Sequence, residues 1–158
     1  MTALYYSFKP CESDEFIKMA LKKFCGEDKD FVIIREKGKK PYVKEENLYF
    51  SLSHTKGLII CAVSDRKVGA DTEKIRNIKS KEKIITRFLK KEAKKNISDE
   101  EFLSQWTRFE SIVKYNGEII LNPTELTNDK INITDLKMNG YIISVCSEDK
   151  KIEKEQII

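Results

Sequence analysis

Histidine, tryptophan, proline and glycine are all scarce in this 158-residue sequence, which has one histidine, one tryptophan, three prolines and six glycines. Its four cysteines are widely spaced and form no CxxC pair, so a zinc site is not expected. No run approaches the roughly 18 to 20 consecutive apolar residues that a membrane helix needs. The first residues lack a basic region followed by an apolar block, so we expect no signal peptide and no membrane partner. Cys61 and Cys146 lie in apolar runs and are expected to be buried free thiols, which fits a cytoplasmic location.

The remaining composition is that of a folded, weakly basic protein. Hydrophobic residues make up 40% of the chain, which is enough for a core and too much for a disordered segment. Lysine and arginine number 30 against 26 aspartates and glutamates, a formal net charge of +4. This balance favours anionic partners without requiring a nucleic acid, and the length fits one domain or two small lobes that share a core.

Hydrophobic periodicity predicts an α+β protein with few helices. One helix is expected from a cap at Ser13 to Gly26, and another from a capping box at Ser98 to Gly117. A basic amphipathic helix is expected within 74–95, which has ten basic residues against two acidic ones. The expected strands are 31–34, 48–52, 58–64, 68–73, 131–133, 136–138 and 141–146, with turns at Asp65–Arg66 and Asn139–Gly140.

Acidic residues at two places are candidates for chemistry. Asp71 and Glu73 lie two residues apart in an expected strand, so both face one side of it. Such carboxylates repel unless they share a proton or a cation such as Mg²⁺, although two ordinary surface acids are the alternative. Glu110 and Lys114 lie four residues apart beside the apolar stripe of the last helix, where they either face a cleft or form a simple ion pair.

Two short segments offer groups that bind phosphate. Ser53 and His54 end an expected strand and begin a Ser-His-Thr-Lys loop with amides, hydroxyls and a cation, although His54 is equally consistent with a structural histidine. The turn at Lys39, Lys40 and Pro41 either holds a phosphate or is a solvated basic loop. The sequence contains no P-loop and no GxGxxG motif, so a nucleotide-binding fold is not indicated.

Taken in order, these motifs resemble the 4′-phosphopantetheinyl transferase superfamily, Sfp-type, over about residues 38 to 120. Each motif is weak alone, and the ordered set carries the resemblance. The set is Lys40-Pro41-Tyr42, Phe50-Ser51-Leu52-Ser53-His54, Ala62-Val63-Ser64, Val68-Gly69-Ala70-Asp71-Thr72-Glu73, Arg87-Phe88 with Glu92, and Trp106-Thr107-Arg108-Phe109-Glu110-Ser111 with Lys114.

The resemblance implies two similar α+β lobes, a pseudo-dimer, with the active site in the cleft between them. We expect an N-terminal lobe at 1–70 and a C-terminal lobe at 71–158. The activity it implies is transfer of the 4′-phosphopantetheine arm of coenzyme A to a serine of an apo acyl or peptidyl carrier protein, with release of adenosine 3′,5′-bisphosphate. The implied enzyme acts as a monomer, with Mg²⁺ as its cofactor and no nucleic-acid partner.

The resemblance also implies a role for each matching residue. Asp71, Glu73 and Glu110 would hold Mg²⁺ against the pyrophosphate of coenzyme A. Glu110 would also be the base for the carrier serine, and Lys114 would stabilise the charge that develops on the pyrophosphate. The implied contacts to coenzyme A are Lys40, Pro41, Ser53, His54 and Lys114.

Phe109 is the main departure from the family pattern, which usually has lysine at this position before the helix glutamate. Arg108 is a candidate replacement for the missing phosphate contact. A degenerate member that binds coenzyme A or a carrier protein without transfer is therefore the alternative to an enzyme, and a basic nucleic-acid-binding module is a third. The basic stretch 74–95 is either a docking surface for an acidic carrier protein or a solvated helix face.

Overall fold

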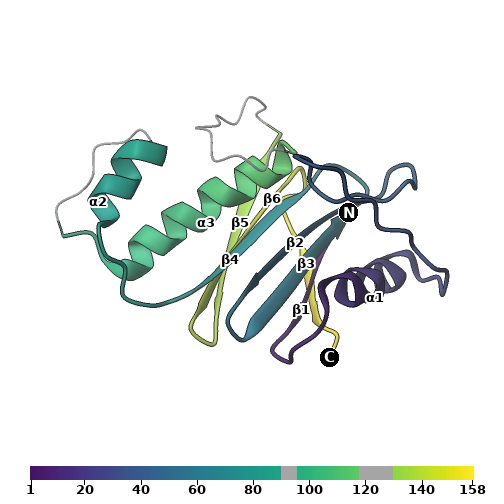
Figure 1. Ribbon diagram of the computed structural model, residues 1–158. Helices are drawn as coiled ribbons and strands as arrows, with labels where there is room; N and C mark the ends of the chain where they lie inside the picture. Colours follow the sequence, from purple (N-terminus) through teal and green to yellow (C-terminus); the bar gives the residue numbers. More distant parts are fainter. Residues whose placement is uncertain (90–95, 118–129) are drawn as a thin grey trace.

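The computed structural model describes residues 1–89, 96–117 and 130–158, and within them the chain is a mixed α+β protein (Figure 1). The expected α+β class is thus confirmed. The helical elements are α1 (Ser13–Cys25), α2 (Lys81–Ile84), a π-helical turn (Ile85–Leu89) that continues α2, and α3 (Asp99–Tyr115). The strands are β1 (Thr2–Ser7), β2 (Tyr49–Thr55), β3 (Leu58–Ser64), β4 (Gly69–Lys74), β5 (Asn132–Met138), β6 (Tyr141–Ser147) and β7 (Glu153–Gln156).

The strands form two separate sheets. The four-stranded sheet has the order β2-β3-β1-β7, in which β1 and β7 are parallel and the other pairs are antiparallel. The three-stranded sheet has the order β4-β6-β5 and is antiparallel throughout. Because β7 pairs with β1, the end of the chain joins the four-stranded sheet, whereas the expected lobe at 71–158 placed it with β4, β5 and β6.

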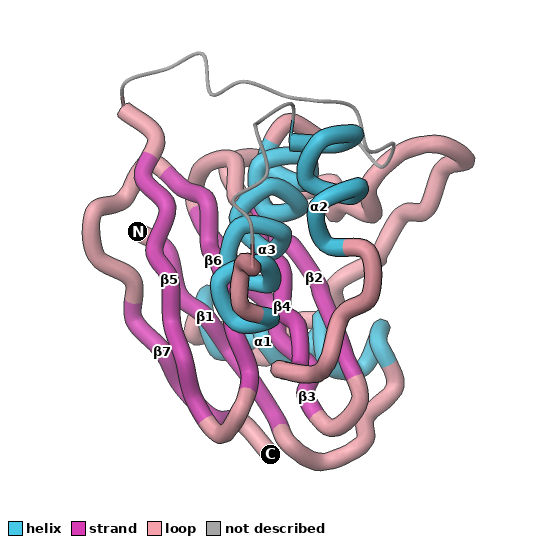
Figure 2. Tube along the Cα trace, turned by 90° about the vertical axis from the view of Figure 1, so that its left-hand side faces the viewer, coloured by secondary structure: helices cyan, strands magenta, loops and turns pink. Residues whose placement is uncertain are grey.

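Figure 1 shows α1 and α3 on the outer sides of the strands. Clusters of buried apolar side chains lie between these layers. One face of α1, with Phe16, Ile17 and Leu21, packs with the side chains of Tyr5 and Val63 on the four-stranded sheet. A second apolar cluster lies between the two sheets and a third beside α3. Figure 2 shows α3 in front of the three-stranded sheet and α1 behind the strands. In the described part of the chain, no helix has the length and apolarity needed to cross a membrane.

Both long helices begin and end close to the expected residues, with one difference in capping. Ser98 caps α3, since its side chain accepts the amide N–H of Glu101. At α1 the cap is Glu12, without a side-chain capping bond, and Ser13 is already in the helix. Gly26 ends α1 in the left-handed conformation, with φ of 65°.

Four local expectations are corrected by the tertiary arrangement. Residues 31–34 form only one bridge, between Ile34 and Tyr42, because no neighbouring strand continues it. The Asp65–Arg66 segment is not a hairpin turn, since β3 and β4 belong to different sheets. Residues 132–138 are a single strand, and β1 was not expected from the sequence. Of the expected helix at 74–95, residues 75–80 are non-helical, and 90–95 lie outside the described residues.

Candidate functional site

A cavity of about 450 Å³ is lined by residues of β2, β4 and α3 and by the turn that precedes Tyr42. The structure places every sequence-predicted site residue in this one lining, namely Lys40, Pro41, Ser53, His54, Asp71, Glu73, Glu110 and Lys114. A neighbouring cavity of about 400 Å³ shares Lys40, Pro41 and Lys114 with it. Segments up to 74 residues apart in the sequence therefore supply one concave, charged surface.

Asp71 is the most buried acidic group of this cavity, with 3% of the residue exposed. Its Oδ1 accepts two hydrogen bonds, one from Ser53 Oγ at 2.8 Å and one from Lys114 Nζ at 2.7 Å. Its Oδ2 is buried and has no hydrogen-bond partner among the described residues. A buried carboxylate oxygen without a partner is costly, so Oδ2 is the position on Asp71 that the acid proton of Glu110 or a cation can occupy.

Glu110 lies one turn before Lys114 on α3 and within hydrogen-bonding reach of Asp71. Burial, followed by the hydrogen bond and the negative charge of Asp71, raises the pKa of Glu110 to about 9, although Lys114 opposes this shift. Without a cation, Glu110 therefore carries a proton at neutral pH. A divalent ion beside Asp71 would displace that proton and leave both groups ionised.

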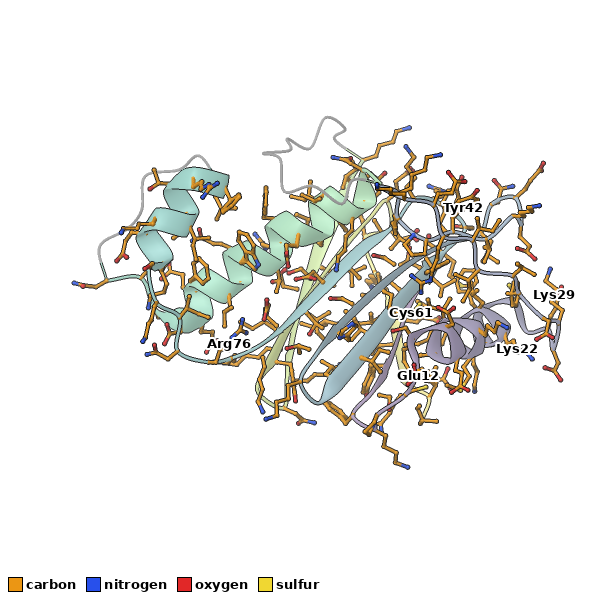
Figure 3. All side chains as sticks on the ribbon, viewed as in Figure 1. Glu12, Lys22, Lys29, Tyr42, Cys61 and Arg76 are labelled. Carbon is orange, nitrogen blue, oxygen red and sulfur yellow. The ribbon has the colours of Figure 1, made fainter. Side chains whose placement is uncertain are left out.

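Glu73 also lines the cavity, but its carboxylate pairs with the guanidinium of Arg76. Arg76 follows the end of β4 (Figure 3). Across residues 1–89, 96–117 and 130–158, no three His, Cys, Asp or Glu side chains are grouped to hold a metal ion. The structure thus brings Asp71 and Glu110 together and leaves Glu73 outside that pair. Two hard-oxygen donors, one with an unpartnered buried atom, fit Mg²⁺, which keeps several waters and few protein ligands.

The two lysines of the cavity have different environments. Lys114 forms the ion pair with Asp71, whereas Lys40 Nζ donates to the backbone carbonyl of Val68 at 2.6 Å. Burial, with a smaller contribution from the positive charge of Lys114, lowers the pKa of Lys40 to about 7. An anion that enters the cavity would favour the protonated form of Lys40, so this residue can add positive charge when a phosphate binds.

The position of α3 depends on a close approach to β4 at Gly69. A Cβ at this position would lie 1.9 Å from the carbonyl oxygen of Ser111 and 2.4 Å from the amide nitrogen of Tyr115. Only glycine allows the helix backbone to lie this near the strand. The contact sets the height of Glu110 and Lys114 above Asp71.

Phe109 and Arg108 do not supply the phosphate contact that the family pattern places before Glu110. Phe109 is 6% exposed and packs against Trp106, with ring centroids 5.6 Å apart. Arg108 pairs with Asp135 on β5 and does not line the cavity. The idea that Arg108 replaces the missing lysine is therefore not supported by its position.

Sequence reasoning missed the contacts that hold β2 against β4. The hydroxyl of Ser51 accepts the amide N–H of Ala70 at 2.9 Å, and that of Ser53 accepts the amide N–H of Thr72 at 3.3 Å. The signal in the sequence is the pair of serines two residues apart in an otherwise apolar strand. It could be recognised only after β4 was known to lie beside β2.

Comparison with known proteins leaves this site to be interpreted from its own chemistry. No protein-family model matches the chain, and a search of curated proteins also found no match.

The raised pKa of Glu110 predicts that the cation-free protein loses stability as pH rises. The unfolded chain ionises Glu110 near pH 4.5 and the folded chain near 9, so the unfolded state is favoured progressively between these values. The lowered pKa of Lys40, about 7, makes stability rise with pH, but only above pH 7. The effect of Glu110 is therefore best measured between pH 5 and 7. This linkage amounts to about 2.5 kcal/mol between pH 5 and 7, so we expect the melting temperature of a chelator-treated sample to fall by about 5 to 10 °C over this window.

Glu110→Gln is the matched variant for this measurement, because glutamine keeps the shape and cannot ionise. Its melting temperature should change little between pH 5 and 7. An unaltered slope in Glu110→Gln would show that another group is responsible for the loss.

Proposed function

We propose that this protein is a 4′-phosphopantetheinyl transferase, which transfers the phosphopantetheine arm of coenzyme A to a serine of an apo acyl or peptidyl carrier protein. The observation that carries the proposal is the single cavity in which Asp71 contacts both Glu110 and Lys114, with Ser53 and His54 in the same lining. In this proposal the two sheets, each with its own long helix, correspond to two lobes, and the cavity lies between them.

The chemistry requires a diphosphate to be held while its P–O bond breaks. Asp71 and Glu110 would hold Mg²⁺, and Glu73 would be a third ligand if it gave up Arg76. When bound, this ion would neutralise negative charge on the diphosphate. Lys114 is fixed by Asp71 at the cavity wall, where its ammonium can stabilise the charge that develops on the leaving phosphate.

The remaining step is proton removal from the carrier serine. The serine oxygen attacks the phosphorus of the pantetheine phosphate, the bond to the adenosine phosphate breaks, and adenosine 3′,5′-bisphosphate leaves. Glu110 can accept the serine proton only in its ionised form, and a cation beside Asp71 favours that form.

The direct test is intact-mass spectrometry of apo acyl and peptidyl carrier proteins after incubation with the full chain, coenzyme A and Mg²⁺. We expect a mass gain of one phosphopantetheine arm, which disappears when a chelator is added or the carrier serine is replaced by alanine. If no carrier protein gains this mass with Mg²⁺ or Mn²⁺, the proposed transferase activity is wrong.

A protein that binds coenzyme A without transfer is the second candidate. It is favoured by the ion pair that engages Glu73 and by the apolar packing of Phe109, since both reduce the groups available to the diphosphate. Calorimetry would distinguish the two, because this candidate predicts Mg²⁺-dependent binding of coenzyme A with no mass gain on any carrier protein.

A further inference from the structure

The contact between β2 and β4 is made by side chains and not by a backbone ladder. These strands are edges of different sheets, so among the described residues the outward amide groups of β4 meet no strand partner there. The hydroxyls of Ser51 and Ser53 accept the N–H groups of Ala70 and Thr72 instead, with a two-residue spacing on both strands. The two serines are both buried, so each satisfies a backbone donor that water cannot easily reach.

Ser53 differs from Ser51 in one additional contact. A serine hydroxyl has a single hydrogen to donate, and Ser53 donates it to Asp71 Oδ1 at 2.8 Å. Lys114 donates to the same oxygen, which leaves Oδ2 for the acid proton of Glu110 or for a cation that displaces this proton. Ser53 therefore cannot donate to a phosphate while it holds Asp71 in this orientation.

We propose that Ser53 is a positioning residue, whose hydroxyl fixes the Asp71 carboxylate so that Oδ2 remains available to a divalent cation. This inference rests on the proposed function, and it replaces the direct phosphate contact expected for Ser53 from the sequence. The same hydroxyl also bonds β2 to β4 through the amide of Thr72. One side chain therefore contributes both to the seam, which is the pair of serine hydrogen bonds between the two sheets, and to the orientation of the carboxylate. Partners that orient a metal ligand typically contribute 10- to 100-fold to metal affinity.

Mn²⁺ titration of the full chain, followed by the electron paramagnetic resonance signal of the free ion, tests this role. Ser53→Ala should weaken Mn²⁺ binding about tenfold or more, because Asp71 loses a donor that holds it. Ser51→Ala is the matched control, because Ser51 makes the same kind of hydrogen bond between β2 and β4 but does not contact Asp71. The Mn²⁺ affinity of this variant should stay within about twofold of that of the unmodified chain. Ser53→Thr keeps the hydroxyl and should restore binding.

Thermal unfolding of the same variants separates positioning from folding. Both alanine variants lose one seam bond, so we expect similar decreases in melting temperature, and only Ser53→Ala should lose Mn²⁺ affinity. If Ser53→Ala does not fold, Ser53→Cys, which retains a weak donor, should show an intermediate affinity.

Two results would overturn the inference, and they differ in what they say about the proposed function. If the unmodified chain binds Mn²⁺ and the Ser53 and Ser51 variants bind it equally well, Ser53 has no positioning role and the proposed function stands. If the unmodified chain binds no Mn²⁺ at millimolar concentration, the cation site fails together with the inference.

Discussion

Replacing Asp71 with asparagine is expected to reduce phosphopantetheine transfer at least about a thousandfold and to abolish Mn²⁺ binding. Asparagine keeps the size of the side chain but removes the negative charge that pairs with Lys114 and faces Glu110. Mass spectrometry of the carrier protein gives the transfer rate, and the titration gives the affinity. The effect should be larger than that of any Ser53 variant, because Asp71 itself would contact the ion.

Asp135→Asn is the control for this prediction. Asp135 lies in the same cross-strand row of the three-stranded sheet, since Asp71 is opposite Ser144 and Ser144 is opposite Asp135. It pairs with Arg108 outside the cavity, so its replacement should leave transfer within a few-fold of normal. Equal losses in the two variants would contradict a specific role for Asp71.

Gly69→Ala is expected to destabilise the protein by about 3 kcal/mol, which corresponds to a decrease in melting temperature of roughly 6 to 12 °C. The added methyl group would meet backbone atoms of Ser111 and Tyr115, which cannot move aside as a flexible side chain does. The helix α3 must shift as a whole, and it carries Glu110 and Lys114 with it. Urea unfolding gives the free energy, and Mn²⁺ titration should show weakened binding in the molecules that remain folded.

Gly26→Ala is a suitable comparison, because Gly26 has φ of 65° and open space around its Cα. An alanine at this position meets no neighbouring atom, so the decrease in the free energy of unfolding measures only the strain of the left-handed conformation, about 1 kcal/mol. If Gly69→Ala lowers the free energy of unfolding no more than Gly26→Ala does, the close approach of α3 to β4 is not what requires glycine at position 69.

Several parts of the fold follow from local sequence alone. Ser98 and the acidic residues behind it predicted the start of α3, and its apolar spacing predicted the buried face that contains Phe102 and Val113. Gly26 predicted the end of α1. The acidic candidates Asp71 and Glu73 were also visible as a pair in one strand. These features depend on interactions within a few residues of the chain, and such interactions leave a pattern in the sequence.

The sequence by itself determined the two long helices, most of the strands and the residue types that could bind a phosphate or a cation. Only the tertiary structure decided that Ser53 and Lys114 donate to Asp71, that Lys40 turns to the carbonyl of Val68, and that Arg76 engages Glu73. It also decided that β7 joins β1, although β7 is short and its four residues are all exposed. The physical reason is that these contacts join segments that lie far apart along the chain. Their partners are chosen by how two sheets and α3 pack, and that packing leaves no periodic signal in any single segment.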